Sequence, residues 1–226
     1  MKPFLTAVDL PRCEKNIQRH LLSPLVKRIH SFVLGPAGTN ISQASDQWLK
    51  RMGLWEKSST QLCITPEESL EKALMVTAAG EMGLFWTCAV YFKLNELFFR
   101  NPDVLPFFVQ ERMALDRMQL ATRQELMREA QAGFPKAWTI ASHLSPSPLI
   151  LDTGCGVRQT NSNAAAAELC ASGQTELCVT TESARMLHGL RTVFEFGSPE
   201  MIFFGGITQS GIQLIREVSL SFPKSL

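Results

Sequence analysis

Three segments of this 226-residue chain share an arrangement of residues that could bind a small anion. In "VLGPAGTNISQAS", "TIASHLSPSPL" and "VRQTNSNAAAAEL", an apolar or β-prone run meets small hydroxyl or amide residues, and a helical pattern then begins. Ser, Thr and Asn are favoured at helix N-caps, and Pro suits a first helical turn. Because a helix start offers backbone N–H groups and the positive end of a dipole, the three segments predict a site for a small acid.

The predicted site residues come from these three helix starts. The substrate-binding candidates are Thr39, Asn40, Ser145, Ser147, Arg158, Asn161, Asn163 and Thr181. The catalytic candidates are His143, Thr160 and Ser162, with His143 chosen for proton transfer because imidazole titrates near neutral pH. An ordinary structural interpretation stands beside each of them: hydroxyl and amide residues cap helices in any α/β protein, His143 could orient a helix start, and Arg158 could be a solvated cation.

Composition excludes several classes of protein. With 45% apolar residues the chain can bury a core, and its 22 Lys and Arg nearly cancel 21 Asp and Glu, so we expect neither a nucleic-acid nor a membrane partner. The beginning of the chain has no continuous apolar segment, and "GLFWTCAVYF" is only about half of a membrane span, which predicts a cytoplasmic protein. The six cysteines show no metal-binding or CxxC spacing, so we expect neither a metal site nor a thiol redox pair.

The order of β-rich and helical runs predicts the fold class. From "IHSFVLG" to "EMIFFGGI", short β-prone runs are separated by single helical patterns such as "PEESLEKALMV" and "SNAAAAELCASG". This alternation is typical of an α/β fold with mostly parallel sheets, in which ligands bind at the carboxyl ends of the strands. Motifs such as GxxxxGK[ST], GxSxG and HExxH are not present in the sequence.

The same three segments carry a resemblance to the prephenate dehydratase family over about residues 32–204. "GPAGTNISQA" resembles the family's GPxGT turn, and "ASHLSP" resembles its SHPQAL segment. "TNSNAAAAELCASGQTELCVTTESARMLHGL" is similar to its Ser/Thr-rich cap, Ala-rich helix and following strand. Where dehydratases have a Thr-Arg-Phe motif this chain reads "GSPEMIFFGG", and only about twenty residues follow, which leaves no room for an ACT domain.

These departures make the chain more similar to the single-domain branch that includes the bacilysin-type prephenate decarboxylase. That branch also has a His-x-Ser-Pro segment, here "HLSP", and an "NS" cap before an Ala-rich helix. The resemblance implies a bilobed fold like type-two periplasmic binding proteins, with the ligand between the lobes. It implies a first lobe of 28–108 plus 190–226 and a second lobe of 109–189. The polar, mixed sequence before residue 28 predicts an N-terminal helical extension over residues 1–27.

The resemblance implies a cofactor-independent lyase of specialised, antibiotic-type metabolism that acts on prephenate or a related cyclic carboxylic acid. Loss of Thr-Arg-Phe favours decarboxylation without aromatisation, because dehydratases use that motif at the substrate. Two alternatives stay open: a dehydratase-like enzyme of a tropone-type pathway, and a catalytically silent module that binds small acids. The sequence also leaves open whether the chain is a monomer or a homodimer.

Overall fold

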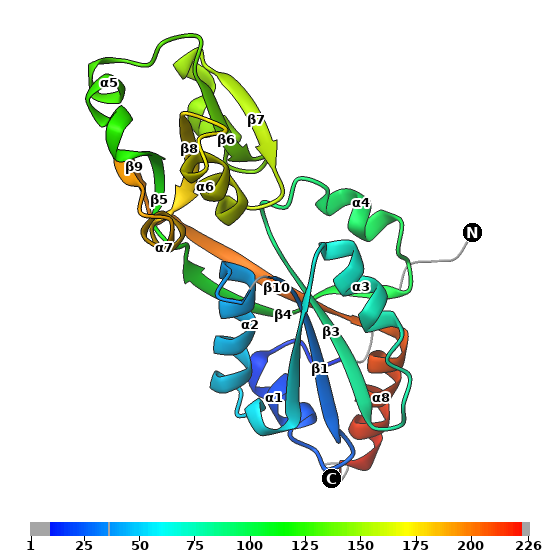
Figure 1. Ribbon diagram of the computed structural model, residues 1–226. Coiled ribbons are helices and arrows are strands. Elements are labelled where there is room, and N and C mark those ends of the chain that lie inside the picture. The colour runs from blue at the N-terminus through cyan, green and yellow to red at the C-terminus, as the bar shows by residue number, and fades with distance from the viewer. Residues whose placement is uncertain (1–9, 36, 223–226) are drawn as a thin grey trace. The chain divides into compact units, whose positions relative to one another are not determined.

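The computed structural model describes residues 10–35 and 37–222 of the chain. Pro36 of the "GPAGT" segment and the first nine residues of the predicted extension lie outside the described residues. The described chain is an α/β protein with two five-stranded sheets, in two compact units (Figure 1). Unit 1 comprises Met1–Met113 with Met201–Leu226, and unit 2 comprises Ala114–Glu200.

Unit 1 contains a sheet with strand order β2-β1-β3-β10-β4. Its elements are α1 (Glu14–Leu21), β1 (Arg28–Leu34), α2 (Asn40–Arg51), η1 (Trp55–Lys57), β2 (Ser58–Cys63), α3 (Pro66–Leu74), β3 (Glu81–Cys88), α4 (Leu94–Phe99), β4 (Val104–Ala114), β10 (Glu200–Thr208) and α8 (Gln209–Ser221). β1 pairs in parallel with β2 and β3, whereas β10 pairs antiparallel to β3.

Helices α2 and α3 pack on opposite faces of this sheet, since successive residues of a strand point to opposite faces. On one face, the hydroxyl of Ser31 in β1 hydrogen-bonds that of Ser45 in α2 at 2.6 Å. On the other face, Phe32 joins a buried cluster with Leu70 and Ala73 of α3. In the chain, α2 follows the carboxyl end of β1 and α3 follows the carboxyl end of β2, so both helices start at that end of the sheet.

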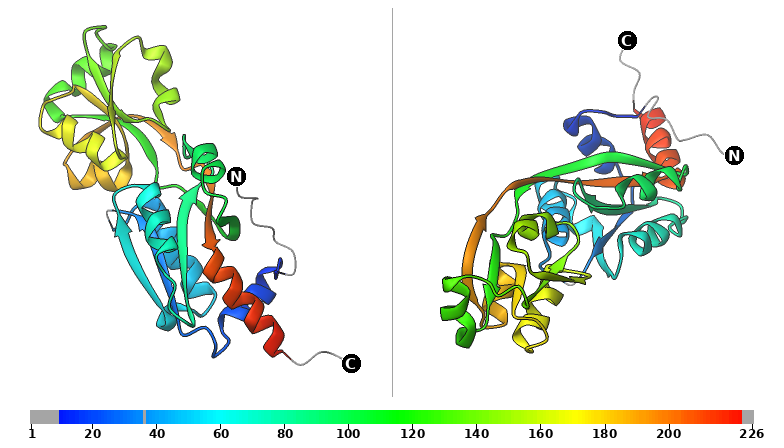
Figure 2. Two further views of the ribbon diagram at one scale, coloured as in Figure 1. Left: turned by 90° about the vertical axis from the view of Figure 1, so that its right-hand side faces the viewer. Right: turned by 90° about the horizontal axis from the view of Figure 1, so that it is seen from above.

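The described part of the segment before β1, for which the sequence predicts a helical extension over residues 1–27, contains helix α1 and packs on unit 1. Helix α1 lies beside α8 (Figure 2), where a ring nitrogen of His20 is 2.9 Å from the hydroxyl of Ser219. The ammonium of Lys57 donates to three backbone carbonyls of residues 22–26 at 3.0 to 3.1 Å. These contacts attach the segment to the core, and its Leu21 and Val26 are fully buried.

Unit 2 contains the second sheet, with strand order β7-β6-β8-β5-β9 (Figure 1). Its elements are β5 (Met118–Thr122), η2 (Gln124–Leu126), α5 (Met127–Ala132), β6 (Thr139–His143), η3 (Ser147–Thr153), β7 (Gly156–Thr160), α6 (Asn163–Ala171), β8 (Leu177–Thr181), α7 (Glu182–Leu187) and β9 (Arg191–Gly197). β6 pairs in parallel with β7 and β8, whereas β5 pairs antiparallel to both β8 and β9.

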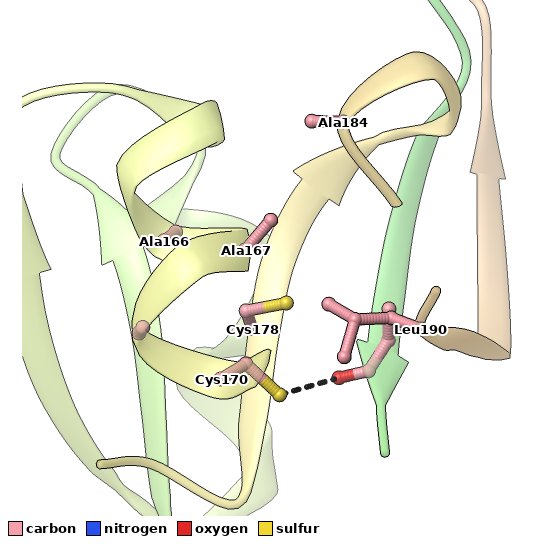
Figure 3. Packing of buried hydrophobic residues seen from close by; sticks show 8 residues of the cluster. Ala166, Ala167, Cys170, Cys178, Ala184 and Leu190 are labelled. Carbon is pink, nitrogen blue, oxygen red and sulfur yellow. Dashed lines mark hydrogen bonds between the residues drawn. The ribbon is translucent and has the colours of Figure 1, made fainter. Parts of the chain in front are cut away.

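Small buried residues let α6 approach the second sheet closely (Figure 3). Ala166 and Ala167 of α6 are fully buried, as are Cys170 of α6 and Cys178 of β8. The thiol of Cys170 donates a weak hydrogen bond to the carbonyl of Ala121 at 3.9 Å. All six cysteines are free thiols, and those of α6 and β8 serve as small packing residues here.

The two sheets differ from the mostly parallel sheets that the sequence predicted. Each sheet keeps three parallel neighbouring strands and adds antiparallel pairings, of β10 with β3 in the first sheet and of β5 with β8 and β9 in the second. Two strands that are consecutive in the chain can pair in parallel only through a crossover connection. Strand β10 enters unit 1 directly from unit 2, without a crossover within unit 1, so it can run antiparallel to β3.

The observed units also differ from the predicted lobes in their bounds. Residues 190–200 were assigned to the first lobe, but β9 pairs with β5 in the second sheet. The chain passes from unit 1 to unit 2 after Met113 and returns after Glu200. Within the described residues, none of the helices combines the length and the apolar character needed to cross a membrane.

Candidate functional site

The carboxyl ends of three neighbouring parallel strands meet at one edge of the second sheet. β6, β7 and β8 end at His143, Thr160 and Thr181, and His143 is the direct register partner of Thr160. The helical segments η3, α6 and α7 follow these strands. The fold therefore brings most of the predicted site residues to one sheet edge, which is where open α/β sheets bind ligands.

Ser162 is the N-cap of α6, as the sequence predicted. Its Oγ accepts a hydrogen bond from the backbone N–H of Ala165 at 3.0 Å. The hydroxyl of Thr160 donates to the carbonyl of Ser162 at 3.0 Å, so its hydrogen is already used within the turn. Across the described residues, the Ser162 hydroxyl donates to no protein group, which leaves its hydrogen available to a ligand.

Asn163, the first residue of α6, is held from two sides. Its backbone carbonyl accepts from the hydroxyl of Thr180 at 2.8 Å, and its side-chain N–H points to the sulfur of Met118 at 3.9 Å. The Oδ1 atom is buried without a hydrogen-bond partner in the described structure. An unsatisfied buried acceptor is unfavourable, so this oxygen is a ready partner for water or a ligand donor.

His143 is the titratable group at this edge. Burial lowers its pKa below the usual histidine range, because the charged imidazolium loses solvation there. Its Nδ1 lies 3.4 Å from the backbone nitrogen of Ser145. The following junction forms a 3-10 helix with Pro146 at its cap position, and the Ser147 hydroxyl donates to the carbonyl of Leu144 at 2.7 Å. Ser147 therefore supports the turn and does not cap an α-helix.

The start of α7 is already filled by carboxylates of the protein itself. Thr181 caps the helix, and its Oγ1 accepts from the N–H of Ala184 at 3.5 Å. Asp116 accepts from the backbone N–H of Ser183 at 3.1 Å and also from its hydroxyl. Glu182 adds a second acidic side chain to the first turn. These charges make the α7 start a poor place for an external anion.

The other predicted helix start, at Thr39 and Asn40, lies in unit 1. Thr39 caps α2, accepting from the N–H of Ser42 at 3.4 Å and donating to the carbonyl of Leu34 at 2.8 Å. Its hydroxyl hydrogen is thus used internally, so Thr39 holds the helix start, and an anion would depend on backbone N–H groups. Gly38 has a φ of 83°, a left-handed conformation that favours glycine.

Helix α3 also starts at a carboxyl end in unit 1, and its start is closed by Glu68. Thr65 caps α3 and accepts from the N–H of Glu68 at 3.1 Å, while Glu68 accepts from the N–H of Ile64 at 2.6 Å. Thr65 and Glu68 have the Thr-x-x-Glu spacing of a capping box, with Glu68 accepting from the N–H of the residue before the cap. In contrast, the first turns of α2 and α6 contain no acidic residue. Among these four helix starts, the described first turns of α2 and α6 contain no acidic residue, whereas the starts of α3 and α7 hold carboxylates of the protein.

The remaining predicted residues lie apart from these caps. Arg158 is exposed in the edge strand β7, and Asn161 is exposed between β7 and α6. Two cavities of about 430 and 560 Å³ are lined by residues of unit 1 and include none of the predicted site residues. No cluster of three or more His, Cys, Asp or Glu suited to a metal ion occurs among the described residues.

Comparison with solved structures defines the class of fold. The chain is similar to the periplasmic VFT2 domain of BvgS from Bordetella pertussis, with 15% identity, 95% of this chain and 94% of that chain covered, and a TM-score of 0.50. It is also similar to DctP7 of Bordetella pertussis, an extracytoplasmic solute receptor binding pyroglutamic acid, with 6% identity, coverages of 84% and 75%, and a TM-score of 0.50. The chain has a two-unit α/β fold of the type-two periplasmic-binding-protein kind.

The prephenate dehydratase of Staphylococcus aureus is a more distant structural match. It has 9% identity, coverages of 78% of this chain and 65% of that chain, and a TM-score of 0.46. The chain thus spans slightly less than two thirds of that dehydratase, and this match adds no argument about activity. No protein-family model and no curated protein matches the sequence.

Proposed function

We propose that the chain binds a small cyclic carboxylic acid and acts on it as a cofactor-independent lyase, with prephenate or a close relative as substrate. The observation that carries this proposal is the contrast among helix starts. The starts of α3 and α7 hold carboxylates of the protein, whereas those of α2 and α6 have none in their first turns. The latter two belong to the segments that resemble dehydratase motifs.

The α6 start has the features expected for a carboxylate site. Ser162 supplies a hydroxyl hydrogen that no described protein group accepts, beside the first backbone N–H groups of a nine-residue helix. The helix dipole favours an anion at this end by about 0.3–1 kcal/mol at an exposed position and more where partly buried. Ser162 is half-buried, as are Thr160 and Asn163, so water screens the charge less than on an open surface.

His143 is the proposed proton donor. Burial favours its neutral form, and a bound carboxylate nearby would raise its pKa and favour protonation. The His143 imidazole would thus become protonated when the substrate binds. In decarboxylation, the ring carboxylate leaves as CO₂, its bonding electrons enter the ring system, and a proton is delivered to a ring carbon while the hydroxyl stays. In dehydration, the proton goes to the ring hydroxyl, which leaves as water together with CO₂.

The segment "GSPEMIFFGG" favours decarboxylation without aromatisation in this proposal. It stands where dehydratases have Thr-Arg-Phe, and it forms the end of β9 and most of β10. Without that motif a dehydratase lacks the groups it uses at the substrate. A dehydratase-like enzyme acting on a seven-membered ring acid of a tropone-type pathway is the alternative substrate assignment. The proposal places the enzyme in the cytoplasm.

A turnover assay tests the proposal directly. Purified protein is mixed with prephenate, and consumption is compared with a buffer control by liquid chromatography and mass spectrometry. We expect a dihydro-hydroxyphenylpyruvate that retains the hydroxyl. Phenylpyruvate, detected by its enolate absorbance in alkali, as the sole enzymatic product would exclude the decarboxylase assignment and support a dehydratase.

A non-catalytic module for small acids is the second candidate function. The observation that favours it is the similarity in fold to the periplasmic VFT2 domain of BvgS and to a solute receptor, together with the replaced Thr-Arg-Phe motif. Isothermal titration calorimetry distinguishes the two functions when combined with the turnover assay. Binding of prephenate without consumption would support the silent module and contradict the lyase.

A further inference from the structure

We propose that unit 1 carries a second, independent site, an esterase-type triad of Ser59, His30 and Glu81. The three residues lie on three adjacent strands, β2, β1 and β3, and Ser59 is the direct register partner of His30. The Ser59 hydroxyl oxygen lies 3.2 Å from Nδ1 of His30. Nε2 of the same imidazole lies 2.7 Å from Oε2 of Glu81. A nucleophile, a base and an orienting carboxylate at these distances define the triad arrangement.

The carboxylate sets the roles of the two ring nitrogens. A carboxylate only accepts hydrogen bonds, so Nε2 carries the hydrogen that Glu81 accepts. The other nitrogen, Nδ1, then has a free lone pair and accepts from the Ser59 hydroxyl. His30 is thereby held in the tautomer that can take a proton from Ser59. The His30 and Glu81 side chains are 18% and 33% exposed, so the triad is shielded and still reachable.

A cavity beside the triad can receive a small substrate. Its volume is about 430 Å³, and both His30 and Glu81 line it. Phe32, Met75 and Val76 supply an apolar wall for an acyl chain or a ring. The cavity and triad lie at the amino ends of β1, β2 and β3, the end of the sheet opposite to the helix starts considered above. The two proposed sites are therefore separate in the fold.

The cavity also holds donors for a developing oxyanion. Lys72 and Gln61, whose side chains carry N–H donors, are among the residues that line the same space. The ammonium of Lys72 forms an ion pair with Glu68 at 2.8 Å, which reduces its charge toward a substrate. Met75 is the C-cap of α3, so the negative end of that helix dipole also faces the cavity. Stabilisation of an oxyanion is thus partial. The substrate class is therefore an activated ester, such as an aryl ester with a short acyl chain, whose leaving group needs little assistance.

The reaction balances without any further reactant than water. The Ser59 oxygen forms a bond to the acyl carbon, and its proton passes to Nδ1 of His30. The bond between the acyl carbon and the aryl oxygen breaks, and the aryl oxide leaves with the proton from His30. Water then attacks the acyl-serine with His30 as base, which releases the carboxylic acid and restores the serine hydroxyl. Glu81 stabilises the imidazolium in both steps.

A serine-directed fluorophosphonate and 4-nitrophenyl butyrate test the site on the full chain. The fluorophosphonate should modify Ser59, with loss of fluoride, and tandem mass spectrometry of the labelled peptide identifies the modified residue. Ser59→Ala should abolish labelling and lower ester hydrolysis above the buffer rate by about 100-fold, and His30→Gln should slow both by a similar factor. Glu81→Gln should slow labelling while Ser59 remains the labelled residue.

Ser58→Ala is the matched control, because the Ser58 hydroxyl donates to the carbonyl of Trp55 and belongs to no triad. It should label and hydrolyse like the wild type. Wild-type protein that leaves Ser59 unlabelled, or Ser59→Ala protein that hydrolyses the ester at the wild-type rate, would overturn the proposal. The labelled peptide of the wild type decides the matter even where a variant folds poorly.

Discussion

Ser162→Ala separates a helix cap from a ligand-binding residue. The substitution removes the oxygen that accepts from the N–H of Ala165 at 3.0 Å, together with the hydroxyl hydrogen that no described protein group accepts. The first loss is structural and occurs in any capped helix. The second loss matters only where the hydroxyl meets a ligand. The two losses have different sizes and different readouts.

The expected magnitudes follow from these two contacts. Replacing an N-cap serine by alanine costs about 1 kcal/mol of stability. For a chain of this length that lowers the melting temperature by about 2–4 °C. A hydrogen bond donated to a charged group contributes about 1.5–3 kcal/mol, which corresponds to a loss of about 10- to 150-fold in kcat/KM or affinity for the acid. A cap alone leaves turnover by the folded protein unchanged.

Thr65→Ala is the matched control for this experiment. Thr65 caps α3 and accepts from the N–H of Glu68 at 3.1 Å, so its replacement removes a contact of the same kind. The α3 start already holds Glu68, which excludes an external anion there. Differential scanning fluorimetry should show similar losses of melting temperature for both variants. Prephenate turnover, or binding by calorimetry, should fall for Ser162→Ala alone.

The reasoning is refuted if the two variants behave alike. Equal stability losses with wild-type turnover in both would make Ser162 an ordinary cap, and the acid site would then lie elsewhere. Equal losses of turnover in both would trace the effect to stability. Only a turnover defect confined to Ser162→Ala, beyond what its melting temperature accounts for, supports the helix start of α6 as the binding site.

Three further predictions concern stability. Gly83→Ala should destabilise the protein by about 1–3 kcal/mol, because a Cβ there would meet the carbonyl oxygen of Ala73 at 2.6 Å, whereas Gly156→Ala, with its nearest contact at 3.7 Å, should melt near the wild type. Lys57→Met should lower the midpoint of urea unfolding, since three backbone carbonyls lose their donor. Burial lowers the pKa of His143, so this imidazole binds a proton more readily in the unfolded chain than in the folded one. The stability of the protein should therefore fall as the pH drops through the ordinary histidine range near about 6.5. His143→Gln should weaken this pH dependence of the melting temperature.

The sequence was a good guide to the order of elements. The β-prone run "IHSFVLG" lies in β1 up to Leu34 and "EMIFFGGI" lies in β10, and the helix over Pro66–Leu74 begins with the Thr-Pro-x-Glu pattern of a capping box. Local patterns suffice for this, since periodicity and caps depend on near neighbours. The antiparallel pairings of β5 with β8 and β9, and of β10 with β3, were missed, because strand direction depends on which distant strand becomes the neighbour.

The caps were also predictable, but their hydrogen-bond roles were not. Thr39 and Ser162 both cap helices as expected, yet only Ser162 keeps its hydroxyl hydrogen, because the Leu34 carbonyl accepts that of Thr39. Similarly, Ser59 and His30 stand 29 residues apart, and only the parallel pairing of β1 with β2 makes them register partners. No spacing rule in a single sequence detects a triad that is built across three strands.

A helix start can accept an external anion only where no carboxylate of the protein already occupies it. Such a carboxylate can come from a residue close in sequence or from a distant one. At α3 the carboxylate is local: Glu68 follows the cap by three residues, and the sequence alone shows that this start is closed. At α7 the carboxylate of Asp116 lies 67 residues from Ser183, and it arrives only because Met118 of β5 pairs with Thr181 of β8. Asp116→Asn combined with Glu182→Gln should therefore leave the α7 start without either of these carboxylates. We expect this variant to gain weak affinity for small carboxylates, measurable by calorimetry in the Ser162→Ala background. Unchanged binding there would show that an unfilled helix start is insufficient, and that Ser162 with its free hydroxyl hydrogen is what distinguishes α6.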